Sequence, residues 1–104
     1  MAGLNKVMII GNLGADPEMR YMADGTAMTS FRVASSRSFT GSDGERREET
    51  EWFPVVTWKK LAELCSQFLQ KGRRVYVEGR LRTRSWDTPD GQRRYRTEVV
   101  AESV

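Results

Sequence analysis

Histidine is missing from this chain of 104 residues, and cysteine occurs only once. Without histidine, the chain lacks the commonest general base and the commonest metal ligand, which excludes most hydrolytic triads and most zinc sites. With Cys65 alone, no disulfide can close within the chain. No P-loop pattern is present either, so the sequence contains no recognisable motif for nucleotide hydrolysis. We therefore expect a binding protein, with no metal and no cofactor, rather than an enzyme.

Long apolar runs are also missing. No stretch approaches the ~20 residues that a helix needs to cross a bilayer. The N-terminal segment lacks the charged start and the long apolar middle of a secretion signal. We therefore expect an intracellular protein with no membrane partner. The length suits about one domain, so residues 1–104 are expected to form a single domain.

Positive charge is concentrated in the last third of the chain. Residues 71–104 hold nine lysines and arginines against five acids, whereas residues 1–70 hold eight against nine. Such an asymmetry suggests a polyanionic partner, although a solvated basic surface would look the same.

Alternating side chains and turn residues predict five strands joined by polar loops. The expected strands cover residues 5–13, 27–38, 49–58, 74–84 and 94–103. Turn formers at both ends of residues 14–26 indicate a connecting loop there. Apolar residues at helical spacing predict a helix over residues 59–71 that buries Cys65, with Lys71 and Gly72 as its stop signal.

This order of elements predicts an all-β fold: a five-stranded OB-fold Greek-key barrel with one α-helix between strands 3 and 4. Other small barrels with an inserted helix fit the same order. OB-folds bind oligonucleotides on one face and in the neighbouring loops, so the fold class predicts a binding site on one face of the sheet.

Arginine and tryptophan side chains alternate onto one face of two expected strands. In the stretch VEGRLRTRSW, every second residue points to the same face of the strand, and such a set is one parity. One parity contains Arg80, Arg82, Arg84 and Trp86. Burying this parity would desolvate its guanidinium groups at a cost of several kcal/mol for each unpaired charge, so we expect it to face outward.

The two tryptophans of the third strand follow the same logic. Trp52 and Trp58 share one parity, and Phe53 and Val55 on the other parity can supply the core. A tryptophan in a small barrel is commonly a core residue, but here we expect both indoles outside, roughly 20 Å apart. Exposed indoles beside arginines favour single-stranded nucleic acid as the ligand, because a nucleic-acid duplex hides the base faces on which aromatic side chains stack.

The first expected strand is apolar on both parities, through Val7, Met8, Ile9 and Ile10. We expect these residues to form an oligomer interface, with the strand at an edge that pairs with a second copy. Burial of both faces inside one barrel explains the pattern nearly as well.

Four stretches of the chain resemble the bacterial-type single-stranded DNA-binding protein family. They are NKVMIIGNLGADPEMRYMADGTA, TEWFPVV, KLAELCSQFLQKGRRVYVEGRLRTRSW and DGQRRYRTEVV, and the similarity runs over essentially the whole chain. The resemblance implies an OB domain, a homotetramer, and single-stranded DNA bound without catalysis or cofactor. It also implies a cytoplasmic, nucleoid-associated protein that protects exposed strands during replication, recombination and repair.

The resemblance also implies site residues. Base-stacking positions fall on Phe39, Trp52, Trp58 and Trp86, and phosphate contacts on Lys6, Lys60, Arg73, Arg82 and Arg84, to which the strand parity adds Arg80. Three positions depart from the common pattern. Phe39 stands where tryptophan is frequent, Trp58 stands where phenylalanine is frequent, and Phe53-Pro54 replaces a His-Arg pair, which removes one expected phosphate contact.

Family members usually continue into a flexible tail with an acidic tip that recruits partner enzymes, and the 104 residues hold no such tail. Replication and repair proteins are therefore expected as partners only if the native protein carries one. Two other functions stay open on the sequence: an RNA-binding or primosome-type OB protein, and a protein-interaction barrel with no nucleic-acid role.

Overall fold

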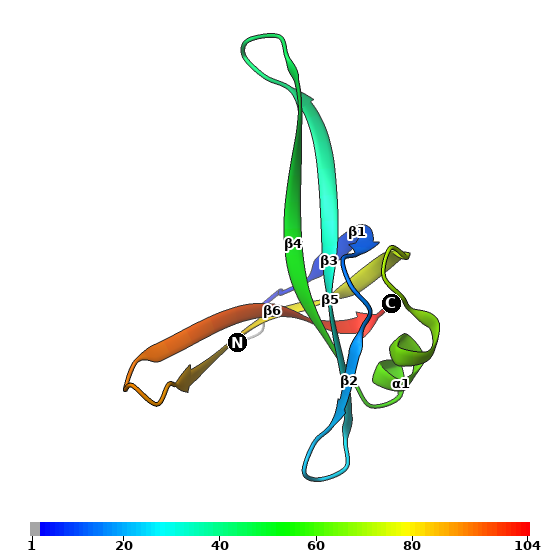
Figure 1. Cartoon of the computed structure of the whole chain (residues 1–104), viewed down its shortest axis with the longest axis vertical. Helices are drawn as coiled ribbons and strands as arrows, with labels where there is room; N and C mark the ends of the chain where they lie inside the picture. The colour runs from blue at the N-terminus through cyan, green and yellow to red at the C-terminus, as the bar shows by residue number, and fades with distance from the viewer. Residues whose placement is uncertain (1–2) are drawn as a thin grey trace.

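A single twisted sheet curls until its first strand meets its third, as Figure 1 shows for the computed structural model, which describes residues 3–104. Residues 1 and 2 of the expected domain lie outside this description. The strands are β1 (Val7–Leu13), β2 (Glu18–Tyr21), β3 (Ala27–Thr40), β4 (Arg46–Trp58), β5 (Arg74–Asp87) and β6 (Arg93–Ser103), and α1 (Lys59–Phe68) lies between β4 and β5. The predicted all-β barrel with one inserted helix is confirmed.

Closure of the barrel follows from the strand pairing. The hydrogen-bonded order is β1-β5-β6-β4-β3-β2, and β1 also pairs with β3 at Asn12 and Leu13. Within residues 3–104 every strand pair is antiparallel except β4 with β6, where Val55 lies opposite Val99. This parallel pair joins the two long hairpins and places their outer faces next to each other.

The core consists of one side-chain parity from each long strand. Val33, Val55 and Val77 are fully buried at its centre. Helix α1 covers one end of the barrel and buries Cys65, as predicted. The Thr29 hydroxyl donates to the Ala62 carbonyl oxygen at 2.7 Å, which ties the helix to β3.

Helix α1 is three residues shorter than its apolar stripe predicts. It ends at Phe68, and Leu69 is already extended, with φ −100° and ψ 150°. Lys71 and Gly72 therefore lie beyond the helix, where Gly72 adopts φ 87° and its N–H donates to the Leu13 carbonyl oxygen at 2.9 Å. No helix within residues 3–104 has the length and apolar character of a membrane span.

The sequence predicts only a connecting loop over residues 14–26, and the structure corrects this, because strand β2 forms within it. Its four residues pair with β3, from Glu18 opposite Ser30 to Tyr21 opposite Ala27. The strand lies at the sheet edge and its side chains are mostly exposed, so its sequence carries no apolar alternation.

Two hairpins extend beyond the barrel and form the arms in Figure 1, one from β3 and β4 and one from β5 and β6. The β3–β4 register continues unbroken to Thr40 opposite Arg46. The radius of gyration is 16.3 Å, against roughly 13 Å for a compact domain of this length. The arms enlarge the surface without adding a core.

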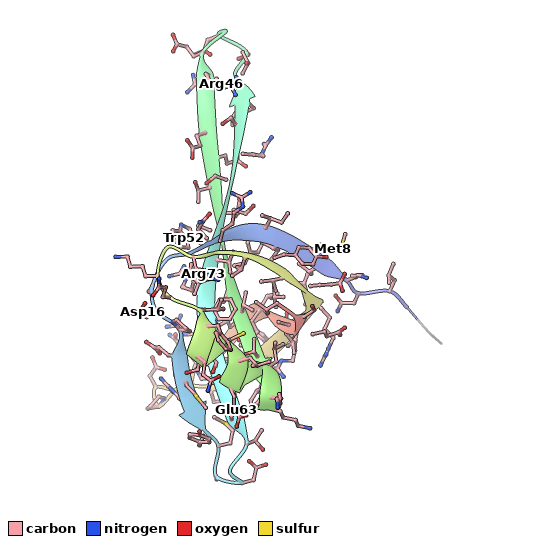
Figure 2. The ribbon with its side chains drawn as sticks, turned by 90° about the vertical axis from the view of Figure 1, so that its right-hand side faces the viewer. Met8, Asp16, Arg46, Trp52, Glu63 and Arg73 are labelled. Carbon is pink, nitrogen blue, oxygen red and sulfur yellow. The ribbon has the colours of Figure 1, made fainter. Side chains whose placement is uncertain are left out.

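Strand β1 is covered on one face only. Ile9 and Leu13 are buried, whereas Met8 is 64% and Ile10 is 53% exposed. Met8 points away from the barrel in Figure 2. The alternative in which one barrel buries both faces of this strand is therefore wrong for the single chain. From Val7 to Gly11, β1 pairs with β5 on one side only, so this stretch has an open edge.

Candidate nucleic-acid interface

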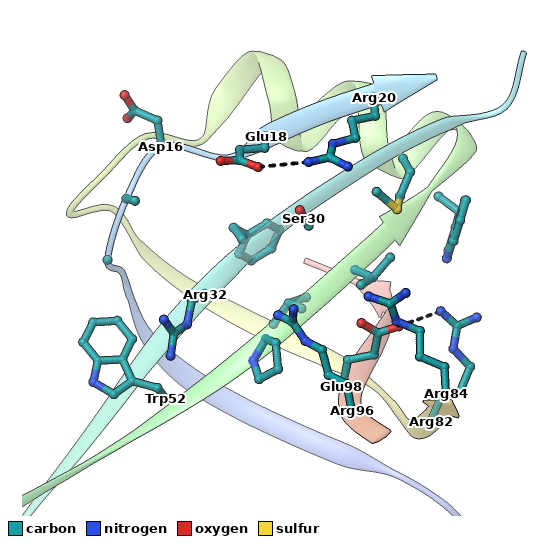
Figure 3. A pocket seen from close by; sticks show the side chains of 18 of the residues that line it. Asp16, Glu18, Arg20, Ser30, Arg32, Trp52, Arg82, Arg84, Arg96 and Glu98 are labelled. Atoms are coloured by element: carbon teal, nitrogen blue, oxygen red, sulfur yellow. Dashed lines mark hydrogen bonds and ion pairs between the residues drawn. The ribbon is translucent and has the colours of Figure 1, made fainter. Parts of the chain in front are cut away.

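One face of the sheet is hollowed into a groove of about 880 Å³ that crosses β2, β3, β4, β6 and β5 (Figure 3). Strand register brings its walls together, because Trp58 lies opposite Met28, Val56 opposite Val100, and Arg82 opposite Glu98. The charged and indole side chains that line the groove are Asp16, Glu18, Arg20, Arg32, Trp52, Trp58, Arg82, Arg84, Arg96 and Glu98.

Trp52 forms one end of the groove and is 47% exposed. The Arg32 guanidinium lies 5.5 Å from the centre of the indole, within cation–π range. The indole also contacts Gly14, where an added Cβ would lie only 2.4 Å from Trp52 Cζ3. The absence of a side chain at residue 14 therefore sets the position of this ring.

Trp58 lines the same groove at the point where β4 ends and α1 begins. It is half-buried, and its neighbours of opposite parity, Val55 and Thr57, are fully buried in the barrel. The alternation argument is thus confirmed for both tryptophans of β4. Val56 and Pro54 lie between them and form an apolar part of the lining.

Arg82 and Arg84 line the opposite wall, around a buried acid. Glu98 is only 3% exposed, and its Oε1 accepts a hydrogen bond from Arg82 Nη2 at 2.8 Å. The same oxygen lies 3.5 Å from Arg84 Nε. Arg84 also lies 5.3 Å from the centre of the Trp86 indole, farther out on the β5–β6 arm.

Three further arginines line the groove that sequence reasoning did not single out, namely Arg20, Arg32 and Arg96. Arg96 lies directly opposite Arg84 across β5 and β6. Two like charges in this arrangement repel, so their pairing costs stability unless an anion lies between them. Arg32 lies on the parity of β3 opposite the buried Phe31 and Val33, but only the β2–β3–β4 register shows which groove it enters.

Three predicted phosphate contacts lie outside the groove lining. Lys6 pairs with Glu78 at 3.2 Å, on the β1–β5 side of the barrel. Lys60 lines a separate hollow beside the β2–β3 turn. Arg80 shares the parity of Arg82, as predicted, but its guanidinium lies 3.7 Å from Glu102.

Three other predicted contacts lie at the margins of the site. Arg73 precedes β5, and its carbonyl oxygen accepts from the Leu13 N–H at 3.0 Å, near the Trp52 end of the groove (Figure 2). Trp86 is 42% exposed on the β5–β6 arm. Phe39 shares the strand parity of the core residue Val33, so it lies on the face of the β3–β4 arm opposite the groove.

The site offers binding groups but no reactive centre. Burial raises the pKa of the Cys65 thiol, which keeps it protonated in the core, away from the groove. Within residues 3–104 no set of acidic or cysteine side chains is arranged to hold a metal ion. What the groove presents is guanidinium groups, indole faces and one buried carboxylate.

A small OB-fold barrel with a basic, indole-lined groove defines a binding protein of the OB class. The chain belongs to the single-strand binding protein family, whose model matches residues 4–104. Single-stranded DNA-binding protein 1 of Chlorobaculum tepidum is 54% identical over 99 residues, which cover 94% of this chain. The structure of Plasmodium falciparum SSB in complex with ssDNA superimposes with a TM-score of 0.88 at 32% identity, covering 96% of this chain and 88% of that one.

These comparisons confirm the resemblance and the OB-fold that it implied. The family is one of binding proteins, in agreement with the expectation that the chain is not an enzyme. The matched region spans 61% of the length of the Chlorobaculum tepidum protein.

Proposed function

We propose that the groove binds single-stranded DNA with little dependence on base sequence, and without catalysis. The observation that carries this proposal is the placement of Trp52 and Trp58 on one sheet face with five arginines. Indoles stack on any base, and guanidinium groups neutralise the phosphates between the bases. The lining holds five arginines against three acids, and this excess of positive charge supports a polyanion as the ligand. The Plasmodium falciparum relative, whose structure holds ssDNA, supports it independently.

The proposed stacking residues are Trp52 and Trp58 in the groove, Trp86 on the β5–β6 arm and Phe39 on the β3–β4 arm. A strand that reaches Phe39 must pass over the edge of its arm. The proposed phosphate contacts are Arg82 and Arg84 in the groove, Arg73 at its Trp52 end, and Lys6, Lys60 and Arg80 along a path that continues beyond it.

Titration with oligo(dT), followed by tryptophan emission, tests the proposal. We expect strong quenching that weakens steeply as salt is added, because phosphate contacts release counterions. Trp52→Ala and Trp58→Ala should each weaken binding by about 1–3 kcal/mol, or roughly 5- to 150-fold. Tyr95→Ala is the matched control, because this aromatic is 69% exposed on the other face of the β5–β6 arm.

Competition between poly(dT) and poly(rU) separates the proposal from an RNA-binding function. We expect poly(dT) to displace poly(rU), and the reverse order would assign the groove to RNA. If neither polymer changes the emission at low salt, the groove does not bind nucleic acid, and the protein-interaction alternative remains.

We also propose that the working unit is a homotetramer built on β1. Met8, Ile10 and Tyr76 together form an exposed apolar face on neighbouring strands β1 and β5. The open edge of β1 next to it offers unpaired backbone groups to a second copy. Val7 and Ile9 point into the barrel of their own chain, so of the four predicted interface residues only Met8 and Ile10 are exposed for such a contact.

The proposed cellular role is protection of exposed strands during replication, recombination and repair, by a cytoplasmic, nucleoid-associated protein in which residues 1–104 act as one OB-fold domain. Membership in the single-strand binding protein family supports this role. Recruitment of replication and repair proteins is proposed only for a form of the protein that carries an acidic tail.

A further inference from the structure

Glu98 is a carboxylate at the place where the proposed ligand would bring its own negative charge. It lines the groove wall among Arg82, Arg84 and Arg96, as Figure 3 shows. The side chain is only 3% exposed, so it is covered by the guanidinium groups that a phosphate would approach. The proposed binding function gives this acid no role.

The position of Glu98 is fixed by its strand. Residues 98–101 of β6 are all buried, between β4 on one side and β5 on the other. The acid Glu18 also lines the groove, but its side chain is 73% exposed on the edge strand β2. Glu18 can turn toward solvent when a phosphate arrives, whereas Glu98 cannot leave the groove without unpacking β6.

A single oxygen of Glu98 holds both arginines. Oε1 accepts from Arg82 Nη2 at 2.8 Å and lies 3.5 Å from Arg84 Nε. Arg82 Nε is buried and has no hydrogen-bond partner among the side chains that the structure describes. The pair therefore carries about one net positive charge toward the groove, although it contains two guanidinium groups.

We propose that Glu98 is an internal counterion that competes with DNA phosphate for Arg82 and Arg84. This inference rests on the proposed binding of single-stranded DNA and deepens it. Binding then exchanges a carboxylate for a phosphate at Arg82, so the groove releases fewer counterions than its arginines suggest. Glu98 is thus a positioning residue that limits affinity and keeps the bound strand exchangeable.

The salt dependence of oligo(dT) binding tests this role. If Glu98 were purely structural, replacing it would not make the salt dependence steeper. Replacing Glu98 by Gln keeps the shape and removes the charge. With Arg82 and Arg84 both free for phosphates, E98Q should bind more tightly at low salt. The slope of log K against log salt should steepen by about 0.7, so that a fourfold rise in salt weakens E98Q about 2.5-fold more than wild type.

Asp87→Asn is the matched control. Asp87 pairs with Arg93 on the β5–β6 arm at 3.6 Å, but its side chain is 70% exposed, and neither residue lines the groove. We expect D87N to keep the wild-type slope. Circular dichroism establishes that each variant is folded before its slope is compared.

The double variant R82Q/E98Q keeps the test decisive even if E98Q alone does not fold, because it removes one positive and one negative charge together. It should return the slope to the wild-type value, since one free arginine replaces the shared pair. An unchanged or shallower slope for folded E98Q, or a double variant about 0.7 shallower than wild type, would overturn the inference alone. Failure of wild-type protein to bind oligo(dT) would instead overturn the proposed function, and this inference with it.

Discussion

Single residues decide how the indole of Trp52 is presented. Its ring contacts both the Arg32 guanidinium and the backbone of Gly14. Gly14→Ala would place a methyl group 2.4 Å from Trp52 Cζ3, so the ring must shift from its present position, which disturbs its contact with Arg32. Loss of a cation–π contact of this exposed kind costs about 0.5–1 kcal/mol, and we expect oligo(dT) affinity to fall about two- to fivefold. Fluorescence titration measures the loss.

Gly3→Ala is the control for that substitution, because nothing lies within 4 Å of a Cβ added there. It should leave affinity unchanged. If G14A binds as tightly as wild type while remaining folded, the position of the Trp52 ring does not limit binding.

A second residue-scale prediction concerns pH. The Lys6 ammonium, 3.2 Å away, and the Tyr76 hydroxyl both stabilise the Glu78 carboxylate and lower its pKa below the ordinary value. The folded chain therefore binds this proton less readily than the unfolded chain. The contribution of Glu78 to stability is complete above its unfolded pKa and is lost as the pH falls through its folded pKa.

Lys6→Met should return the pKa of Glu78 toward its ordinary value, because the hydrogen bond from Lys6 is the main cause of the shift. Carboxyl-carbon NMR titration of Glu78 measures this directly. A pKa that stays low in K6M would assign the shift to Tyr76 instead.

At the residue scale, the sequence predicts the face of a side chain better than its partner. Alternation alone places Trp52, Trp58, Arg82 and Arg84 on the outer face, because the two-residue period of a strand is local geometry. It does not show that Lys6 is paired with Glu78, or that Arg80 is paired with Glu102. Those pairs depend on strand register, which joins residues far apart in the chain.

At the scale of elements, β5 and β6 approach each other closely at Gly79. A Cβ added at Gly79 would lie 2.1 Å from the Val100 carbonyl oxygen, beside the irregularity in the β5–β6 register. The Val100 carbonyl belongs to the backbone and cannot move aside as a flexible side chain can. Gly79→Ala should therefore destabilise the fold by about 1–3 kcal/mol. Thermal unfolding should show a lower Tm, by about 4–8 °C for each kcal/mol.

Gly41→Ala provides the comparison within the β3–β4 arm. The atoms nearest an added Cβ there belong to the side chains of Arg47 and Asp43, which can move. We expect a Tm close to wild type. Equal losses of Tm in G79A and G41A would contradict the assignment of strain to the β5–β6 crossing.

Element boundaries show where local sequence signals end. The apolar stripe of α1 continues past Phe68, but Leu69 turns out of the helix and the chain then hydrogen-bonds to β1 through Gly72. Tertiary pairing overrides the helical pattern there. Strand β2 gives no signal, because an exposed strand of four residues forms only once β3 is there to pair with it.

At the scale of the whole molecule, the apolar face of β1 and β5 is left exposed by residues 3–104 of a single chain. If this face is the proposed oligomer interface, Ile10→Glu places a charge in it without disturbing the barrel, because Ile10 is 53% exposed. We expect the mass from light scattering to fall below that of wild type, with an unchanged circular dichroism spectrum.

Tyr21→Glu serves as the control, since Tyr21 is 67% exposed on β2, at the opposite end of the sheet order from β1. It should keep the wild-type mass. A wild-type mass for I10E, or a monomeric wild-type protein, would overturn the proposed interface. The sequence predicts this interface from two apolar parities, but only the structure shows that Met8 and Ile10 are the exposed pair.

The groove lining begins at Gly14 and ends at Glu98, and it draws side chains from β2, β3, β4, β5 and β6. No short fragment of the chain therefore contains a usable part of it, and a synthetic peptide copied from any one strand would bring isolated charges without their counterparts. Transplanting this surface onto another scaffold requires the entire barrel. We expect the tips of the two arms, by contrast, to tolerate cutting or insertion, because they are exposed turns outside this lining.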